Sequence, residues 1–224
     1  VLITTDKVYF NNEWIFPYRE TDRLGGYDPY SASKACAELI IDSYRNSFFN
    51  KKNYSVHKKA IAVARAGNVI GGGDWAKDRL IPDIVKGLIK NETIHIRNPL
   101  SVRPWQHVLE PVLGYLMLGE KLSQDPVSFS EAYNFGPLSE DALSVKEMVE
   151  LAIAEWGTGK YEEFKNIDQP HEAGLLKLDI SKTKNFIGWH PVMNALTAVA
   201  KTIQWYKNFN DSPETIVGYT EQQI

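Results

Sequence analysis

The stretch Ala60-Ile61-Ala62-Val63-Ala64 decides the fold class of this chain. It is short and continuously apolar, which is typical of a strand buried on both faces of a parallel sheet. It is followed by Gly67 and then by the triple glycine Gly71-Gly72-Gly73, and glycines of this kind mark a turn or loop after the strand. The sequence therefore predicts a buried parallel strand at this position.

Upstream of this strand, the sequence predicts another strand and a long helix. Val1-Leu2-Ile3-Thr4 is apolar and β-branched, as strands are. Asp28-Pro29 supplies an N-cap and a proline at the first helical position, and apolar residues recur at helical spacing from there to about Phe49. Because a strand needs neighbours to be stable, we expect the sequence to begin inside a domain.

Downstream, predicted helices and strands alternate. Helices are predicted for residues 79–90, 108–122, 145–156, 181–188 and 193–208, and strands for residues 94–96 and 132–136. This alternation indicates an α/β fold, whose ligand site is expected at the carboxyl ends of the strands. The polar tail after Asp211 is expected to be loose.

The composition excludes several classes of protein. A hydrophobic content of 43% with 24% charged residues is ordinary for a globular protein, and the formal net charge of −3 gives no electrostatic case for binding nucleic acid or an anionic membrane. No apolar run approaches the roughly 20 residues that span a bilayer. Cys36 is the single cysteine and is expected to be a small buried side chain, and no clustered His, Cys and acidic residues suggest a metal site. The cytoplasm is the expected compartment.

The segment Tyr30-Ser31-Ala32-Ser33-Lys34 places a tyrosine and a lysine on the same face of the predicted helix. An ammonium beside a phenol stabilises the phenolate, so this pair would suit Tyr30 to act as a general base. The same spacing also occurs by chance on many exposed helices. The pair alone therefore leaves a solvated surface pair as an alternative.

A polar cluster at the end of the first predicted strand changes that balance. Thr4-Thr5-Asp6-Lys7-Val8-Tyr9 combines a hydroxyl, a carboxylate and an amine. A strand-end hydroxyl followed through a loop by Tyr-x-x-x-Lys resembles the short-chain dehydrogenase/reductase superfamily. From Val1 to about Asn208 the chain resembles its extended branch, which acts on nucleotide sugars. The resemblance implies an α/β fold made of the C-terminal part of a Rossmann-type parallel sheet and a smaller α/β substrate-binding domain.

Asp6 and Lys7 point to one subgroup of that branch. The 4-epimerases typically have small residues at these two positions, whereas the dTDP-glucose 4,6-dehydratases usually have Asp-Glu. The Asp-Lys pair resembles the CDP-glucose 4,6-dehydratases, which are hydro-lyases. A 4-epimerase or reductase of the same branch, and a non-catalytic fragment that binds nucleotide sugars, remain alternatives.

Further segments resemble the same subgroup, namely residues 65–75, 78–83, 96–99, 103–108, 189–191 and 204–206. They carry amide and guanidinium groups, which suit the phosphates of a nucleotide diphosphate. The predicted substrate-binding residues are Asn68, Arg79, Leu80, Arg97, Arg103 and His107. For His107, a contact with the ligand and a place in the core are equally expected.

The resemblance also implies catalytic roles. Tyr30 would take the proton of the sugar 4-hydroxyl, Thr5 would hydrogen-bond that hydroxyl, and Lys34 would hold the nicotinamide ribose of NAD. Asp6 would act as the general acid at the 6-hydroxyl, while Lys7 would either remove the C5 proton or stabilise the enolate electrostatically. The implied cofactor contacts are Tyr30, Lys34, Ala66, Gly67 and Asn68.

The implied organisation has two domains and a tail. The remainder of the NAD-binding domain would comprise residues 1–70 and 105–136, the nucleotide-sugar domain residues 71–104 and 137–210, and the tail residues 211–224. The glycine-rich phosphate loop that opens this fold has no counterpart here, so we expect an N-terminal part to be missing and apolar surfaces to be exposed. The resemblance further implies a homodimer for the full-length protein and a role in deoxysugar biosynthesis, such as that for lipopolysaccharide.

Overall fold

The centre of the fold is a three-stranded parallel sheet in the order β1-β2-β7. The computed structural model describes residues 1–163 and 175–224. The strands are β1 (Leu2–Thr5), β2 (Val63–Ala66) and β7 (Ala132–Phe135). Their register brings Thr5, Ala66 and Phe135 side by side at the carboxyl ends. The parallel α/β sheet predicted from the sequence is therefore present.

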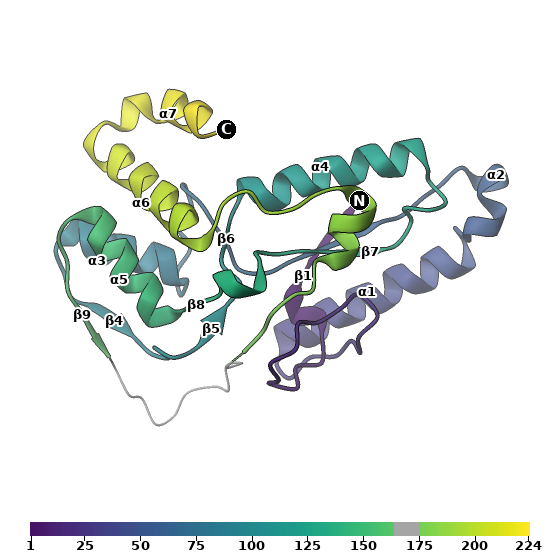
Figure 1. The fold of residues 1–224 in the computed structure, drawn as a ribbon, viewed down its shortest axis with the longest axis horizontal. Coiled ribbons are helices and arrows are strands. Elements are labelled where there is room, and N and C mark those ends of the chain that lie inside the picture. The colour runs from purple at the N-terminus through teal and green to yellow at the C-terminus, as the bar shows by residue number, and fades with distance from the viewer. Residues whose placement is uncertain (164–174) are drawn as a thin grey trace.

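Two long helices cover opposite faces of this sheet (Figure 1), namely α1 (Pro29–Ser47) and α4 (Leu109–Gln124). The predicted N-cap of α1 forms, because the side chain of Asp28 accepts a hydrogen bond of 3.0 Å from the amide of Ser31. On the other face, Leu118 of α4 joins Ala64 and Tyr133 in one buried apolar cluster.

A second buried apolar cluster lies beside the sheet, between α3 (Leu80–Lys90), α5 (Val145–Trp156) and α6 (Ala195–Asp211). Ser144 and Glu147 form a capping box at the start of α5, which is predicted as a helix over residues 145–156. Short strands complete this region: β3 (Val69–Ile70) pairs with β6 (Gln106–His107), β4 (Ile94–Ile96) with β9 (Tyr161–Glu163), and β5 (Val102–Arg103) with β8 (Leu143–Ser144). The remaining elements are η1 (Asp6–Val8), η2 (Lys51–Asn53), α2 (Tyr54–His57), η3 (Ser139–Asp141), η4 (Thr183–Ile187), η5 (Pro213–Thr215) and α7 (Ile216–Gln223).

The segment before α6 returns to the sheet. Ile180, Ile187 and Trp189 pack in the same cluster as the sheet side chains, although the sequence-based boundaries assign them to the nucleotide-sugar domain. The two-domain division stays a prediction. Within the described ranges, no helix is long and apolar enough to cross a membrane.

Three local expectations were wrong. Strand β2 starts at Val63 rather than at residue 60, because the backbone N–H and C=O of Ile61 are hydrogen-bonded to the hydroxyl of Ser130 instead of a neighbouring strand. Cys36 is exposed on α1 rather than buried. The tail is not loose, since η5 and α7 fold back on α6, and the side chain of Gln223 donates a hydrogen bond to the carbonyl of Lys201.

The expected exposure of apolar surface is confirmed. Val1, Leu2 and Ile3 of the β1 edge are exposed, as are Leu39 and Ile40 on α1. In the part of the chain that the structure describes, β1 pairs only with β2. An unpaired edge with exposed apolar side chains is a surface prone to association.

A buried polar row ties α1 to the sheet. Thr4, Arg65 and Asn134 are neighbours in register across the three strands. The guanidinium of Arg65, only 4% exposed, donates two hydrogen bonds of 2.8 Å to the carboxylate of Glu38 on α1, which also accepts one from the hydroxyl of Thr4. Arg65 donates a third to the hydroxyl of Tyr9, which donates in turn to the side chain of Asn134.

We predict that Glu38→Gln lowers the free energy of unfolding by about 3 kcal/mol, because it leaves the Arg65 guanidinium charged, buried and without its counter-ion. Urea denaturation would measure the loss. The matched control is Asp42→Asn, which breaks the more exposed pair between Asp42 and Arg45 on the same helix and should cost at most about 0.5 kcal/mol. Equal losses in the two variants would contradict the structural role of the buried pair.

Candidate functional site

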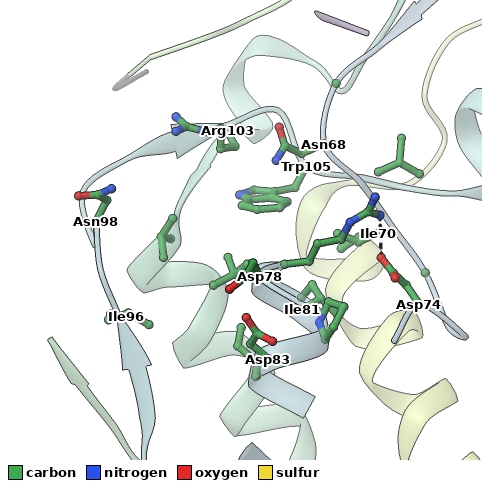
Figure 2. A pocket seen from close by; sticks show the side chains of 18 of the residues that line it. Asn68, Ile70, Asp74, Asp78, Ile81, Asp83, Ile96, Asn98, Arg103 and Trp105 are labelled. Atoms are coloured by element: carbon green, nitrogen blue, oxygen red, sulfur yellow. Dashed lines mark hydrogen bonds and ion pairs between the residues drawn. The ribbon is translucent and has the colours of Figure 1, made fainter. Parts of the chain in front are cut away.

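A cavity of about 770 Å³ opens at the carboxyl ends of β1 and β2. Thr5, Asp6 and Lys7 after β1, Tyr30 at the start of α1, and Gly67 with Asn68 after β2 line one part of it. The loop between β3 and α3, together with α3, β4 and β5, supplies further lining residues. Figure 2 shows this part, with Asn68, Arg103 and Trp105 on one side and Asp83 and Ile96 farther from them.

Asp6 is the most perturbed acid at this site. It is 2% exposed, and burial raises its pKa from the ordinary 3.8 to about 6, although Thr5, Lys7 and Arg103 act in the opposite direction. Its Oδ1 accepts a hydrogen bond of 3.0 Å from the Thr5 hydroxyl, while its Oδ2 has no hydrogen-bond partner within the described residues. A carboxyl group with a pKa of about 6 is half protonated at pH 6, far more than an ordinary aspartate, and this favours a role as a general acid.

Thr5 fixes the local backbone after β1. Its hydroxyl accepts a hydrogen bond from the amide of Lys7 and thereby caps the short helix η1. Because this turn follows the last residue of β1 directly, the three polar residues Thr5, Asp6 and Lys7 all reach the cavity.

Tyr30 and Lys34 share one face of α1 as predicted. The Lys34 ammonium lies 5.9 Å from the centre of the Tyr30 ring, and the Tyr30 side chain, which is half exposed, lines the cavity. Lys34 itself is not among the lining residues. A hydroxyl and an ammonium at the mouth of a cavity are donors that suit the hydroxyl groups of a ribose.

Gly67 allows a close approach between the two strand ends. A β-carbon at this position would lie 2.7 Å from Cγ of Pro104 and 3.2 Å from Oδ2 of Asp6. The absence of a side chain therefore lets the Asp6 carboxyl pack against the turn after β2. Ala66, by contrast, is buried at the end of β2 and does not line the cavity.

The predicted arginines reach the cavity and lie beside carboxylates. Arg79 pairs with Asp74 at 2.9 Å, and Arg97 lies 4.0 Å from Asp78. Both pairs are largely exposed, so they contribute little to stability. Arg103 is buried, and its guanidinium donates to the backbone carbonyl of Val102.

Most predicted site residues come together in this cavity, and three do not line it. Those that line it are Thr5, Asp6, Lys7, Tyr30, Gly67, Asn68, Arg79, Leu80, Arg97 and Arg103. Lys34 lies one helical turn after the lining residue Tyr30 on α1, and Ala66 directly precedes the lining residue Gly67. His107 is buried in β6. Burial lowers the pKa of His107 to about 4, and its Nε2 has no hydrogen-bond partner among the described residues, so both the ligand contact and the core role stay predictions.

The sequence analysis missed several lining residues, among them Asp74, Asp78, Asp83, Asn98 and Trp105. Asp74 and Asp78 precede Arg79 in a loop after three glycines, and this mixture of charges was a usable signal. Trp105 gave none, because a tryptophan in a short strand region is equally expected in the core. Its indole N–H donates to the carbonyl of Leu143, which is how the cavity wall joins β8.

The chain is similar to curated nucleotide-sugar dehydratases. It is 50% identical over 207 residues to the CDP-glucose 4,6-dehydratase of Salmonella typhimurium, which covers 92% of this chain and 58% of that protein. It is 27% identical over 222 residues to the dTDP-glucose 4,6-dehydratase of Streptomyces griseus, covering 97% of this chain and 61% of that protein. The chain thus spans about three fifths of the length of these relatives.

Solved structures share the fold. The dTDP-glucose 4,6-dehydratase of Streptomyces venezuelae, solved with NAD bound, superposes with a TM-score of 0.76 at 21% identity, covering 96% of this chain and 62% of that one. The UDP-glucuronic acid 4-epimerase of Bacillus cereus gives a TM-score of 0.76 at 17% identity, covering 92% and 60%. The fold of this chain is therefore shared with a dehydratase and with an epimerase.

The family model described as GDP-mannose 4,6 dehydratase matches residues 1–202 of the 224. The match includes the strand-end Thr-Asp-Lys, the Tyr-x-x-x-Lys helix and the arginines of the cavity. With the parallel sheet and the cavity at its carboxyl edge, the chain belongs to the GDP-mannose 4,6 dehydratase family.

Proposed function

We propose that the protein takes part in the NAD-dependent dehydration of CDP-glucose to its 4-keto-6-deoxy derivative. The observation that carries this proposal is Asp6, a buried carboxyl group that lines the cavity beside Thr5 and whose pKa is raised to about 6. An elimination of water needs such a proton donor. A 4-epimerase of the same branch has no step that uses it.

The acid step follows from the position of Asp6. As the C6–O bond of the sugar breaks, Asp6 gives its proton to the leaving hydroxyl, and water departs. The proton at C5 is lost in the same elimination, and Lys7, which lines the cavity next to Asp6, receives it or stabilises the enolate by its charge. The oxygen leaves with one proton from the sugar hydroxyl and one from Asp6, so the step is balanced.

The other residues position the sugar. Tyr30 accepts the proton of the 4-hydroxyl, and Thr5 holds the same hydroxyl by a hydrogen bond. NAD, when bound, would oxidise the sugar at C4, which makes the C5 proton acidic, and after water has left would return the hydride to C6 while a proton returns to C5. Lys34 would hold the ribose of such a cofactor as a hydrogen-bond donor and Tyr30 as an acceptor, and Gly67 and Asn68 line the same cavity as Tyr30.

The nucleotide assignment rests on two supports. Arg79, Arg97 and Arg103 line the cavity and offer planar donors that suit a diphosphate. Half of the aligned residues are identical to a CDP-glucose 4,6-dehydratase, which exceeds the identity with the dTDP-glucose enzymes. We therefore propose CDP-glucose rather than dTDP-glucose as the substrate.

Compartment, pathway and assembly belong to the same proposal. We place the protein in the cytoplasm, in deoxysugar biosynthesis of the kind that serves lipopolysaccharide. A homodimer is supported by α1, where Leu39, Ile40 and Tyr44 are exposed apolar side chains on the helix that carries Tyr30. Burying them against a second copy would remove apolar surface from water.

The proposal is tested by incubating the purified protein with NAD and, separately, CDP-glucose, dTDP-glucose and GDP-glucose. We expect the 4-keto-6-deoxy product from CDP-glucose only, detected by mass spectrometry. An exchange of configuration at C4 without loss of water would identify an epimerase instead. Binding of CDP-glucose without any product would favour a non-catalytic nucleotide-sugar module.

We expect Tyr30→Phe to lower kcat by at least about 100-fold, because general-base catalysis typically contributes that much or more. The substitution removes only the hydroxyl, and the half-exposed ring keeps its place on α1. The matched control is Tyr44→Phe on the same helix, which lies outside the cavity lining and should retain full activity. Normal turnover by Tyr30→Phe would refute the base assignment.

Asp6 also predicts a pH dependence of stability. Its folded-state pKa of about 6 lies above the ordinary 3.8, so the folded chain binds this proton more tightly than the unfolded chain does. The resulting stability is complete below about pH 4 and is lost as the pH rises to 6, at a cost of about 3 kcal/mol. Asp6→Asn cannot ionise, so its advantage in urea unfolding over the natural chain should grow by about that amount between pH 4 and pH 8. An advantage that is independent of pH would contradict the raised pKa.

A further inference from the structure

We propose that Tyr206 and Trp205 of α6, with Thr220 of α7, position the cavity loop, defined here as residues 71–78. The inference rests on the proposed function, because its consequence is the affinity of the cavity for a nucleotide diphosphate. The family model ends at residue 202, so these three residues lie outside the match that defines the family. The region of Thr220 is polar in sequence and was expected to be a loose tail.

Tyr206 makes the direct contact. It is fully buried, and its hydroxyl donates a hydrogen bond of 2.6 Å to the backbone carbonyl of Asp74 in the cavity loop. Burial raises the pKa of Tyr206 to about 12, so the hydroxyl keeps its proton and remains a donor at any physiological pH. Its ring also meets Trp75 of the loop edge to face, with the centroids 5.1 Å apart.

Trp205 supports the loop at its glycines. A β-carbon on Gly72 would lie 2.0 Å from Cδ2 of Trp205, so the backbone of the loop rests directly on the indole. The indole in turn stacks on Phe209, with the ring planes 5° apart. Only glycine fits at position 72 without moving this aromatic stack.

Thr220 fixes the orientation of the indole. Its hydroxyl accepts a hydrogen bond of 2.8 Å from Nε1 of Trp205 and donates one to the carbonyl of Ile216 within α7. The helix α7 is therefore linked to the cavity loop through the indole of Trp205.

The cavity loop carries charged side chains whose orientation depends on its contacts with Trp205 and Tyr206. Asp74 and Asp78 both line the cavity, and Asp74 is paired with Arg79 at 2.9 Å, as the dashed line in Figure 2 marks. Arg79 is the N-cap residue of α3, so its backbone follows the end of the loop. The backbone of Asp78 has a positive φ of 61°, a conformation that an aspartate adopts at a cost and that its surroundings must hold. A loop released from Tyr206 would present Arg79 to a diphosphate in many orientations rather than one.

The test compares three variants with the natural chain. Tyr206→Phe removes only the hydroxyl that bonds the loop, Thr220→Val removes only the hydroxyl that bonds Trp205, and Thr220→Ser restores it. The control is Thr215→Val, which deletes a hydroxyl bonded to the carbonyl of Ser212 in the same C-terminal segment, with no bond to the loop. We would measure the Kd for CDP by calorimetry, KM and kcat for CDP-glucose with NAD, and amide hydrogen exchange of residues 71–79.

We expect Tyr206→Phe to weaken CDP binding roughly fivefold, the effect of one net hydrogen bond, and to raise KM by a similar factor with kcat unchanged. Thr220→Val should have a smaller effect in the same direction, and Thr220→Ser and Thr215→Val should resemble the natural chain. The amides of residues 71–79 should exchange faster in Tyr206→Phe and in Thr220→Val than in the natural chain. In Thr220→Ser and Thr215→Val their exchange should be unchanged.

Two results would overturn the inference. One is unchanged exchange of the loop amides in Tyr206→Phe; the other is a lowered melting temperature in that variant with CDP affinity unchanged, which would leave Tyr206 a purely structural residue. If the natural chain binds no nucleotide at all, the proposed function fails, and the exchange measurement still decides whether α6 and α7 hold the loop.

Discussion

The ion pair between Glu38 and Arg65 is the interaction on which the arrangement of the site depends. A charged pair that is almost completely removed from water is stable only when nearly every donor and acceptor is satisfied. Here the carboxylate of Glu38 accepts hydrogen bonds from Nε and Nη2 of Arg65 and from the hydroxyl of Thr4. The guanidinium also donates a hydrogen bond to the hydroxyl of Tyr9. The position of α1 against the sheet is therefore fixed by directional bonds as well as by apolar packing.

This fixed position brings two distant segments to one edge of the sheet. Thr4 is hydrogen-bonded to Glu38, and the next residues along the chain are Thr5, which ends β1, and Asp6. Glu38 lies two helical turns after Tyr30 on α1, so the same bond that holds the helix also sets the distance between Tyr30 and the strand end. The catalytic groups proposed here come from different elements, and the polar row is what makes them neighbours.

The sequence predicted the elements, and which residues line the cavity, better than it predicted the interactions that hold them. The caps at Asp28 and Ser144 were visible because a helix start has a local signature. The partner of Arg65 was not visible, since a residue within a buried strand gives no sign of which helix will supply its counter-ion. The boundary of β2 and the packing of α7 were missed for a similar reason: Ser130 and Lys201 are remote in sequence from the groups they bind. The roles of individual site residues could be expected only through the family resemblance, because hydroxyls, acids and lysines at a strand end have no unique chemistry.

Because Gly67 packs closely against Asp6, a substitution at position 67 would have two effects that a mutational scan cannot separate. A glycine in the turn after β2 is readily interpreted as space reserved for a cofactor, yet the nearest atoms around it belong to Pro104 and to the Asp6 carboxyl. Any larger side chain would displace the carboxyl or alter its burial, and so change the protonation of a residue on a different strand. Loss of activity after substitution at position 67 would therefore report on the acid as much as on the cofactor, and only a titration could separate the two.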